Sequence, residues 1–186
     1  GGLRAGVEPF VEQLAAPTAT PGGGSASAAA AAMAAGLAHM VAAMSRGKKA
    51  YAQYERELSE AIAQLATLKE DLKAAIDEDA KAYDEVVKAF KASKDVSDPN
   101  ALTLPAIKQA TLVPLGVAEK AREVKGWAET LGPITNPKMA SDLTVSKALA
   151  DAAVTGAVAN VEINLQDLPD QAFVGQIRGK LAALKN

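Results

Sequence analysis

The sequence predicts an all-α protein, an antiparallel bundle of five to six helices around an Ala-rich central helix. Hydrophobic residues make up 49% of the 186-residue chain, and aromatic residues make up only 4% of it. Many of the hydrophobic residues are Ala, which has the highest helix propensity. Apolar residues recur every three or four positions, the period of one helix face. Runs that alternate with a period of two do not stand out. The length fits a single domain, which we place at residues 1–186.

The first three helices are separated by glycine and proline residues. A short helix is predicted at residues 7–16 and ends before Pro17. A glycine turn then opens an Ala-rich helix at residues 25–44, and a long helix covers residues 48–92. The apolar stripe of the long helix comprises Tyr51, Tyr54, Leu58, Ile62, Leu65, Leu68, Leu72, Ile76, Tyr83, Val87 and Phe90.

Three further helices complete the bundle. The first is predicted at residues 104–130, with Pro105 in its first turn and Pro114 as a kink. The others are predicted at residues 140–165 and 169–184. The connections are short, which favours antiparallel neighbours.

The Ala-rich helix lies in a stretch without charge, from Gln13 to Ser45. Residues 25–44 are long enough to span a membrane. They are mostly Ala with Ser, Gly and His, and hold few Leu, Ile, Val or Phe, so a buried central helix is favoured over a membrane span. The N-terminal pattern of a signal peptide is not evident. We therefore expect a cytosolic protein without a membrane partner.

Composition excludes several functions. The chain has no Cys, which rules out disulfides, thiolate metal sites and cysteine catalysis. Basic and acidic residues number 20 and 22, a balance that argues against a nucleic-acid partner. His39 is the one histidine, and a single His cannot assemble a metal site, so we expect it to be packed in the core.

Asp79 is the first candidate functional residue. It falls in the gap of the apolar stripe, three residues after Ile76 and four before Tyr83. Asp79 should therefore face the bundle interior, whereas Asp77 and Glu78 should point outward. A carboxyl group on an apolar face has a raised pKa unless it is partnered, which suits a general acid at neutral pH. A structural Asp paired with a neighbouring helix is the alternative.

The helix at residues 140–165 carries three more polar candidates. We take its inward face to contain Val145, Leu149, Ala153 and Gly156. Asp142, Asn160 and Asn164 fall on that face by spacing. The two amides are four residues apart and could together hold the edge of a planar ligand. Capping of the helix start by Asp142, and structural hydrogen bonds from the amides, are the alternative.

Two further segments could bind a substrate. The glycine turn before the Ala-rich helix can expose backbone N–H groups to an anion or a carbonyl oxygen, although close helix packing explains it equally well. Its members are Gly22, Gly23, Gly24 and Ser25. Lys48 and Lys49 follow that helix and could meet a substrate carboxylate, or could be solvated charge alone.

Together these segments resemble the formiminotransferase-cyclodeaminase and methenyltetrahydrofolate cyclohydrolase family of folate enzymes. The matching motifs are Pro-Gly-Gly-Gly-Ser before the Ala-rich helix (residues 21–44), Gly-Lys-Lys-Ala-Tyr (47–51), Asp-Glu-Asp-Ala-Lys-Ala-Tyr (77–83), Val-Pro-Leu (113–115), Ser-Asp-Leu (141–143), Gly-Ala-Val-Ala-Asn-Val-Glu-Ile-Asn-Leu (156–165) and Asp-Gln-Ala-Phe (170–173). They occur in the family's order over about residues 9–180. The chain departs from the family at the loop of residues 93–100 and at Ala140, where some members carry arginine.

The resemblance implies an all-α homodimer that acts on the N5–N10 bridge of a tetrahydrofolate derivative, which is its substrate, without a cofactor or metal. It implies Asp79 as the proton donor, and Asp142, Asn160 and Asn164 as pocket residues. The expected reaction is hydrolysis of 5,10-methenyltetrahydrofolate to 10-formyltetrahydrofolate, preferred because the sequence shows no fused transferase domain. One alternative is a formimidoyltetrahydrofolate cyclodeaminase that releases ammonia. Another is a helical dimer that binds folate, or is purely structural, without turnover.

Overall fold

The computed structural model describes residues 1–185, which form six α-helices, short 3₁₀ segments and no strand. The α-helices are α1 (Arg4–Ala15), α2 (Gly23–Ser45), α3 (Glu55–Ala92), α4 (Asn100–Leu131), α5 (Ala140–Leu165) and α6 (Gln171–Ala183). The 3₁₀ segments are Lys49–Tyr54, Ser93–Asp95, Gly132–Ile134 and Pro137–Met139. The prediction of an all-α helical protein is confirmed.

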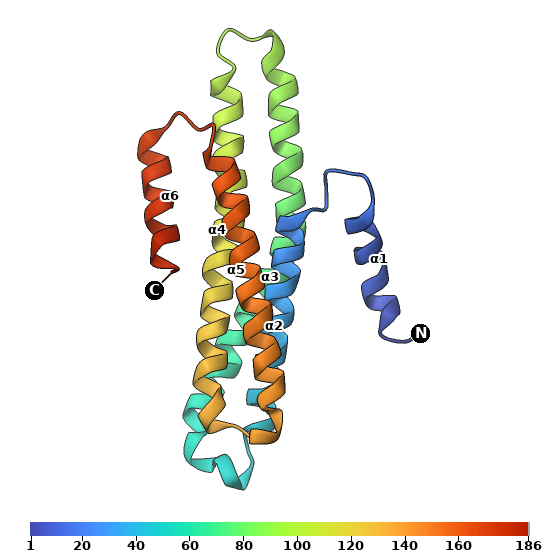
Figure 1. Ribbon diagram of the computed structural model, residues 1–186, viewed down its shortest axis with the longest axis vertical. Helices are drawn as coiled ribbons and strands as arrows, with labels where there is room; N and C mark the ends of the chain where they lie inside the picture. The colour runs from blue at the N-terminus through green and yellow to red at the C-terminus, as the bar shows by residue number, and fades with distance from the viewer. Residues whose placement is uncertain (186) are drawn as a thin grey trace.

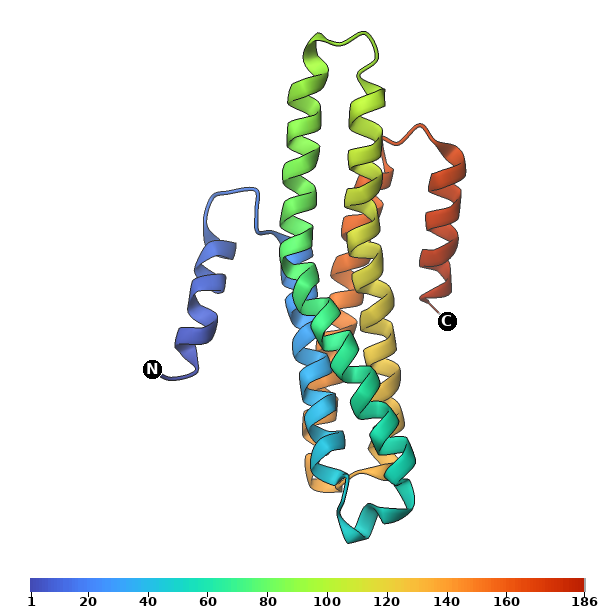
Figure 2. The same ribbon diagram turned by 180° about the vertical axis from the view of Figure 1, so that it is seen from behind.

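Helices α2 to α5 pack as an elongated four-helix bundle (Figure 1). Helices α3 and α4 continue past the other two as a two-helix hairpin, and α6 folds back beside α4 and α5 (Figures 1 and 2). In both views α1 stands to one side of the bundle. The predicted stripe differs from the structure at Tyr83 and Phe90, which are 43% and 51% exposed.

Helix α2 is the central helix that the sequence predicts. Its Ala side chains, among them Ala31, Ala35 and Ala38, are fully buried against Leu58 and Leu65 of α3 and against α4 and α5. Such small side chains allow neighbouring helix backbones to approach closely. By length and composition, α2 and the segment Asn100–Ile134 could each cross a membrane, but both contribute buried residues to the bundle core.

The predicted inward face of α5 is wrong at Val145, which is 49% exposed. The buried face instead contains Leu143, Ser146, Ala150, Ala153 and Ala157. Apolar and small residues occur on every side of α5, so hydrophobic spacing does not identify its core side. The fully buried Ser146 hydroxyl donates to the Ala34 carbonyl of α2 (2.7 Å) and fixes the pairing of the two helices.

A polar cluster joins the last helix to the bundle, beside the apolar contacts of that helix. Asp170 caps α6, because its carboxylate accepts a hydrogen bond from the Phe173 N–H (3.1 Å). The Lys108 ammonium of α4 donates to the same carboxylate (2.6 Å) and lies 5.4 Å from the centre of the Phe173 ring. The Lys108 bond and the Phe173 N–H lower the pKa of Asp170. The Asp-Gln-Ala-Phe segment therefore positions α6.

Candidate active site

Asp79 lies where the N-terminus of α2 crosses the middle of α3. Its carboxyl group accepts a hydrogen bond from the backbone N–H of Ser25 in the first turn of α2. The N-terminus of a helix carries partial positive charge and favours an anion. As the sequence predicts, Asp79 is partly buried, whereas Asp77 and Glu78 are exposed.

Gly24 makes this contact possible. A Cβ built on Gly24 would overlap the Cγ and both oxygens of Asp79. Any other residue at this position would have to displace the carboxyl group. The glycine turn thus contributes by lacking side chains, so that the backbone of α2 reaches the acid.

Ser25 fixes the same crossing from the other side. Its side chain is fully buried, and its hydroxyl donates to the carbonyl oxygen of Ile76 on α3 (2.7 Å). Ser25 therefore contacts α3 twice, through its N–H at Asp79 and through its hydroxyl one helical turn earlier. Its side chain holds the two helices together and is not among the residues that line the cavity described next.

A cavity of about 290 Å³ opens over the Asp79 carboxyl group. The sequence suggests six of the residues that line it: Gly22, Gly23, Gly24, Asp79, Asn160 and Asn164. The remaining lining residues are Ala19, Thr20, Tyr83, Val86, Ala110, Pro114 and Ile163. Four segments distant in the sequence thus meet at one hollow: the turn before α2, the middle of α3, the middle of α4 and the end of α5.

The two amides border the cavity from α5. The Asn160 Nδ2 donates to the Gly156 carbonyl of its own helix (2.9 Å), and the Asn164 Nδ2 donates to the Ala110 carbonyl of α4 (3.1 Å). A Cβ on Gly23 would lie 3.6 Å from the Asn160 amide nitrogen, so α2 and α5 nearly touch beside the acid. These hydrogen bonds hold both amides in fixed orientations.

Burial raises the pKa of Asp79 above the ordinary value of 3.8, and the Ser25 N–H opposes this rise only in part. Desolvation disfavours the charged form of a carboxyl group, whereas a hydrogen bond to the carboxylate favours it. A carboxyl group that keeps its proton closer to neutral pH is suited to donate it to a bound molecule and to take it back.

Three predicted site residues lie away from this cavity. Asp142 is in the first turn of α5, 18 residues before Asn160, which corresponds to about 27 Å along the helix. Lys48 and Lys49 follow the C-terminus of α2, about 34 Å from its glycine turn. All three lie at the opposite end of the bundle from the cavity (Figure 1).

Several cavity residues were not identified as candidates from the sequence. Tyr83, Val86 and Ile163 lie near Asp79 or the two amides on the same helices, so helical spacing could have indicated them. Ala110 and Pro114 come from α4, and only the Val-Pro-Leu motif at residues 113–115 gave a signal there. Apolar residues that line a cavity resemble core residues in a sequence.

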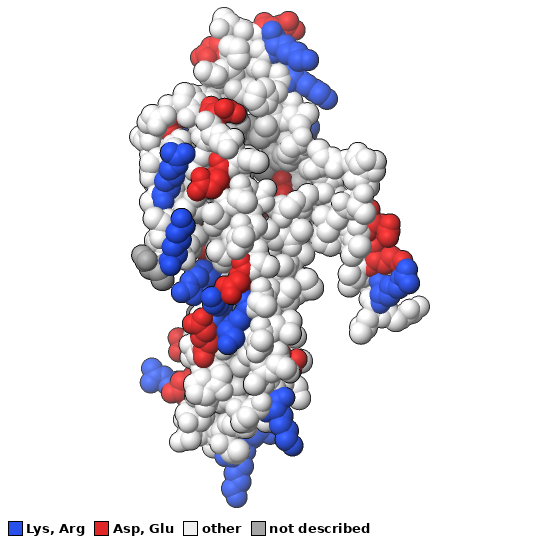
Figure 3. Space-filling view, viewed as in Figure 1, with Lys and Arg blue, Asp and Glu red and all other residues white. Residues whose placement is uncertain are grey.

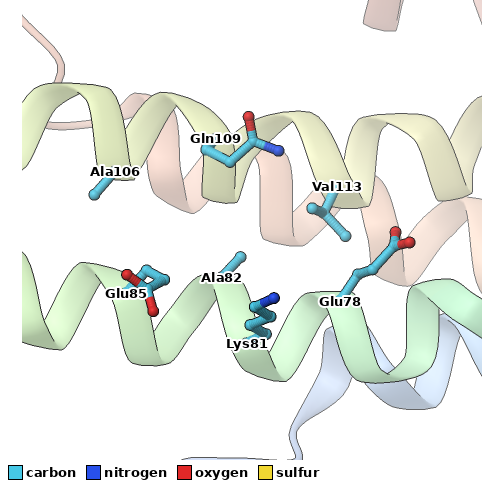
Figure 4. A pocket seen from close by; sticks show the side chains of 7 residues that line it. All are labelled: Glu78, Lys81, Ala82, Glu85, Ala106, Gln109 and Val113. Carbon is cyan, nitrogen blue, oxygen red and sulfur yellow. The ribbon is translucent and has the colours of Figure 1, made fainter.

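A second hollow, of about 250 Å³, lies between α3 and α4 (Figure 4). Its lining includes Lys81 and two exposed carboxylates, Glu78 and Glu85, together with the apolar side chains of Ala82 on α3 and Val113 on α4. It contains none of the predicted site residues. We therefore place the candidate site at Asp79, where a partly buried acid, a helix N-terminus and two amides converge.

The lining of the candidate site holds no second carboxyl group and no Lys, Arg or His, and His39 lies elsewhere on α2. His39 is half-buried, and burial together with Lys69 and Arg46 lowers its pKa. Within residues 1–185, no three His, Asp or Glu side chains are placed to hold a metal ion.

The fold and the site together define a helical bundle with a partly buried carboxyl group beside a cavity. The chain belongs to the formiminotransferase-cyclodeaminase family, whose model matches residues 6–183. This confirms the resemblance seen in the sequence motifs.

The relatives carry two different activities in their names. A methenyltetrahydrofolate cyclohydrolase of Methylorubrum extorquens is 34% identical over 182 residues, 96% of this chain and 88% of that protein. The formimidoyltransferase-cyclodeaminase of Sus scrofa is 33% identical over 179 residues, which are 94% of this chain but 33% of that longer protein. The chain thus spans about a third of the length of this relative.

The fold is also that of a solved relative. The crystal structure of formiminotetrahydrofolate cyclodeaminase from Thermotoga maritima matches with a TM-score of 0.88 at 28% sequence identity, over 96% of this chain and 87% of that one. Fold and family are therefore established together.

We predict that Gly24→Ala displaces the Asp79 carboxyl group, because the added methyl would occupy its place. The free energy of unfolding should fall by about 1–3 kcal/mol, the usual cost of overpacking. Urea denaturation measures this change. The matched control is Gly126→Ala in α4, where a Cβ meets nothing within 4 Å; it should stabilise the helix by up to about 1 kcal/mol. Equal effects of the two variants would contradict the proposed contact.

The raised pKa of Asp79 also predicts how stability depends on pH. Between the ordinary carboxyl pKa and the higher folded pKa, the unfolded chain has lost the proton that the folded chain keeps. Stability therefore falls as pH rises through this window. Asp79→Asn cannot ionise, so the melting temperature of this variant relative to the wild type should rise as the pH increases from the ordinary carboxyl value of 3.8 through the higher folded pKa. The variant Asp77→Asn, at an exposed position, should not show this rise. If the difference in melting temperature between Asp79→Asn and the wild type did not change with pH, the raised pKa would be contradicted.

Proposed function

We propose that this chain hydrolyses 5,10-methenyltetrahydrofolate to 10-formyltetrahydrofolate, with Asp79 as the general acid and base. The observation that carries the proposal is a single partly buried carboxyl group at the floor of the cavity, held by the N-terminus of α2 and with a raised pKa. The cyclohydrolase of Methylorubrum extorquens, which the chain matches over 88% of its length, supports hydrolysis as the reaction.

The proton movements of the hydrolysis need only one such group. Water adds to the methenyl carbon, and the Asp79 carboxylate accepts a proton from that water. The bond between N5 and this carbon then breaks, and Asp79 returns the proton to N5. The hydroxyl group of the adduct loses its remaining proton to solvent as the carbonyl forms, and the formyl group stays on N10. The methenyl bridge of the substrate is a cation, which the carboxylate also stabilises by charge before water adds.

The amides of Asn160 and Asn164 have a complementary role in the proposal. Their nitrogens donate to backbone carbonyls of the chain, so we expect their oxygens to accept hydrogen bonds from the N–H groups of the pterin. The backbone of Gly22 and Gly23 borders the same cavity and would allow the flat ring to approach closely. Pro114 and Ile163 would supply apolar contact to its faces.

The proposal includes a homodimer, a cytosolic location and no metal or cofactor. Asp142, Lys48 and Lys49 lie too far from the Asp79 cavity of their own chain to touch a ring bound there. We therefore propose no catalytic step for Asp142. A contact of Lys48 or Lys49 with the glutamate tail would require a second copy of the chain.

The alternative reaction is the release of ammonia from 5-formiminotetrahydrofolate. The name of the Thermotoga maritima structure and the names of the formimidoyltransferase-cyclodeaminases favour it. There N10 attacks the formimino carbon, and the amino group leaves with a proton. A single carboxyl group can serve this reaction as well, because it takes the N10 proton and gives one to the leaving nitrogen.

The two reactions change the methenyl absorbance in opposite directions, so one assay separates them. We expect the purified chain to consume 5,10-methenyltetrahydrofolate with loss of its absorbance and no ammonia release. Formation of that absorbance from 5-formiminotetrahydrofolate, together with ammonia, would replace the proposed reaction with the cyclodeaminase. Binding of both compounds without turnover would leave a folate-binding protein.

Asp79→Asn tests the assigned acid. The amide keeps the shape of the carboxyl group but cannot transfer a proton, so kcat should fall by about 10²–10⁴-fold while the folate derivative still binds. Asp77→Asn changes an exposed carboxylate two residues earlier on the same helix and should leave kcat within about twofold, because it lies outside the cavity. Comparable kcat values for the two variants would remove Asp79 from the mechanism.

A further inference from the structure

Helix α4 carries a proline in its interior, beside the Asp79 cavity. Pro114 is buried and lines this cavity together with Ala110, one helical turn earlier. Proline has no backbone N–H, so Pro114 cannot donate the usual helical hydrogen bond to the Ala110 carbonyl, four residues before it. The proline ring also crowds that carbonyl and tilts it away from the helix axis. The Ala110 carbonyl therefore requires a donor from outside this ladder of helical hydrogen bonds.

A side chain of α5 supplies that donor. The Asn164 Nδ2 donates to the Ala110 carbonyl (3.1 Å). Asn160 makes a different kind of bond, because its Nδ2 donates to the Gly156 carbonyl of its own helix (2.9 Å). In a regular helix the Gly156 carbonyl also receives the backbone N–H of residue 160, whereas Pro114 leaves the Ala110 carbonyl without such an N–H. The amide of Asn164 thus serves a carbonyl whose helical donor is missing.

We infer that Pro114 is a positioning residue for Asn164: by withholding an N–H, it leaves the Ala110 carbonyl to the Asn164 amide and so fixes which side of that amide faces the cavity. The hydrogen bond holds the amide nitrogen toward α4, which leaves the amide oxygen to the cavity that Asn164 lines. The reverse orientation would set two oxygens against each other and leave the Ala110 carbonyl without this donor, which is unfavourable.

The surroundings of Asn164 leave its oxygen to a ligand. The lining of the cavity includes no Lys, Arg or His that would donate to this oxygen. In Figure 3 the area over the start of α2 and the adjoining edge of α5 is largely without Lys and Arg. The amide oxygen therefore meets its ligand by a hydrogen bond between neutral groups, for which the direction of the acceptor matters more than charge.

The positioned oxygen gives the site a requirement for its ligand. An amide that turns freely offers either an acceptor or a donor, whereas Asn164 held by Ala110 offers an acceptor alone. A ligand N–H at this point completes the hydrogen bond, so loss of the positioning lowers the affinity and not the rate of proton transfer at Asp79. This step rests on the proposed function, because it concerns a bound folate derivative; the link between Pro114 and Asn164 does not.

The first test needs no substrate. Pro114→Val and Pro114→Ala restore the same backbone N–H with different bulk, so an effect common to both belongs to the N–H. In each variant the side-chain amide protons of Asn164 should exchange with water at least about tenfold faster than in the wild type, as NMR measures. The amide of Asn160 is the control within the same spectrum, and Pro105→Val, at an exposed proline of the same helix, is the control variant. Unchanged exchange at Asn164 in the Pro114 variants, or an equal change in Pro105→Val, would overturn the inference.

The second test measures turnover of whichever folate compound the wild type converts. Pro114→Val should raise KM about tenfold, the loss of one hydrogen bond, with kcat within about threefold of the wild type. Asn164→Ala should raise KM to a similar extent. The double variant should be no worse than Asn164→Ala alone, because the residue at 114 then has no amide to position.

The kinetic outcomes separate the positioning role from the proposed reaction. Effects of Pro114→Val and Asn164→Ala that multiply in the double variant would overturn the positioning role, as would an unchanged KM in Asn164→Ala. A wild type that converts neither folate compound would contradict the proposed function, and the exchange rates of the Asn164 amide would still decide whether Pro114 positions it.

Discussion

The close approach of the N-terminus of α2 to the middle of α3 is the contact on which the candidate site depends. At this crossing a glycine allows backbone to touch a carboxyl group, a serine joins the two helices through its N–H and its hydroxyl, and a cavity remains above. The Ala-rich sequence of α2 serves the same purpose over its whole length, because small side chains bring α3, α4 and α5 to a common centre. Gly156 repeats the arrangement on α5, where a Cβ would overlap the Ser27 hydroxyl. The small residues of α2 and α5 therefore allow the helices to approach closely at the site.

The position of Asp79 involves a conflict between stability and chemistry. Burial raises its pKa, so the folded chain is less stable when the group is ionised. The Ser25 N–H reduces this cost without removing it, and the dipole of α2 acts in the same direction. A salt bridge to a lysine or arginine would stabilise the carboxylate further, but it would lower the pKa and make the group a weaker base for the proton that it takes from water. The chain does use that kind of contact at Asp170, where Lys108 and the cap of α6 lower the pKa of a group with a structural task.

Helical spacing correctly predicted which way a side chain points around its helix. It did not predict which residues lie close together along the helix axis. The gap in the apolar stripe correctly placed Asp79 toward the interior and Asp77 and Glu78 toward solvent. The same spacing grouped Asp142 with Asn160 and Asn164, although 18 residues separate the first two. A period of 3.6 residues fixes the angle around a helix, and only the rise of 1.5 Å per residue tells that such residues lie about 27 Å apart.

The spacing gave the wrong face at Val145, because apolar and small residues occur on every side of α5 and no single face stands out. Tertiary neighbours such as Pro114 on α4 could not be derived at all, since nothing in a local pattern says which helix lies opposite.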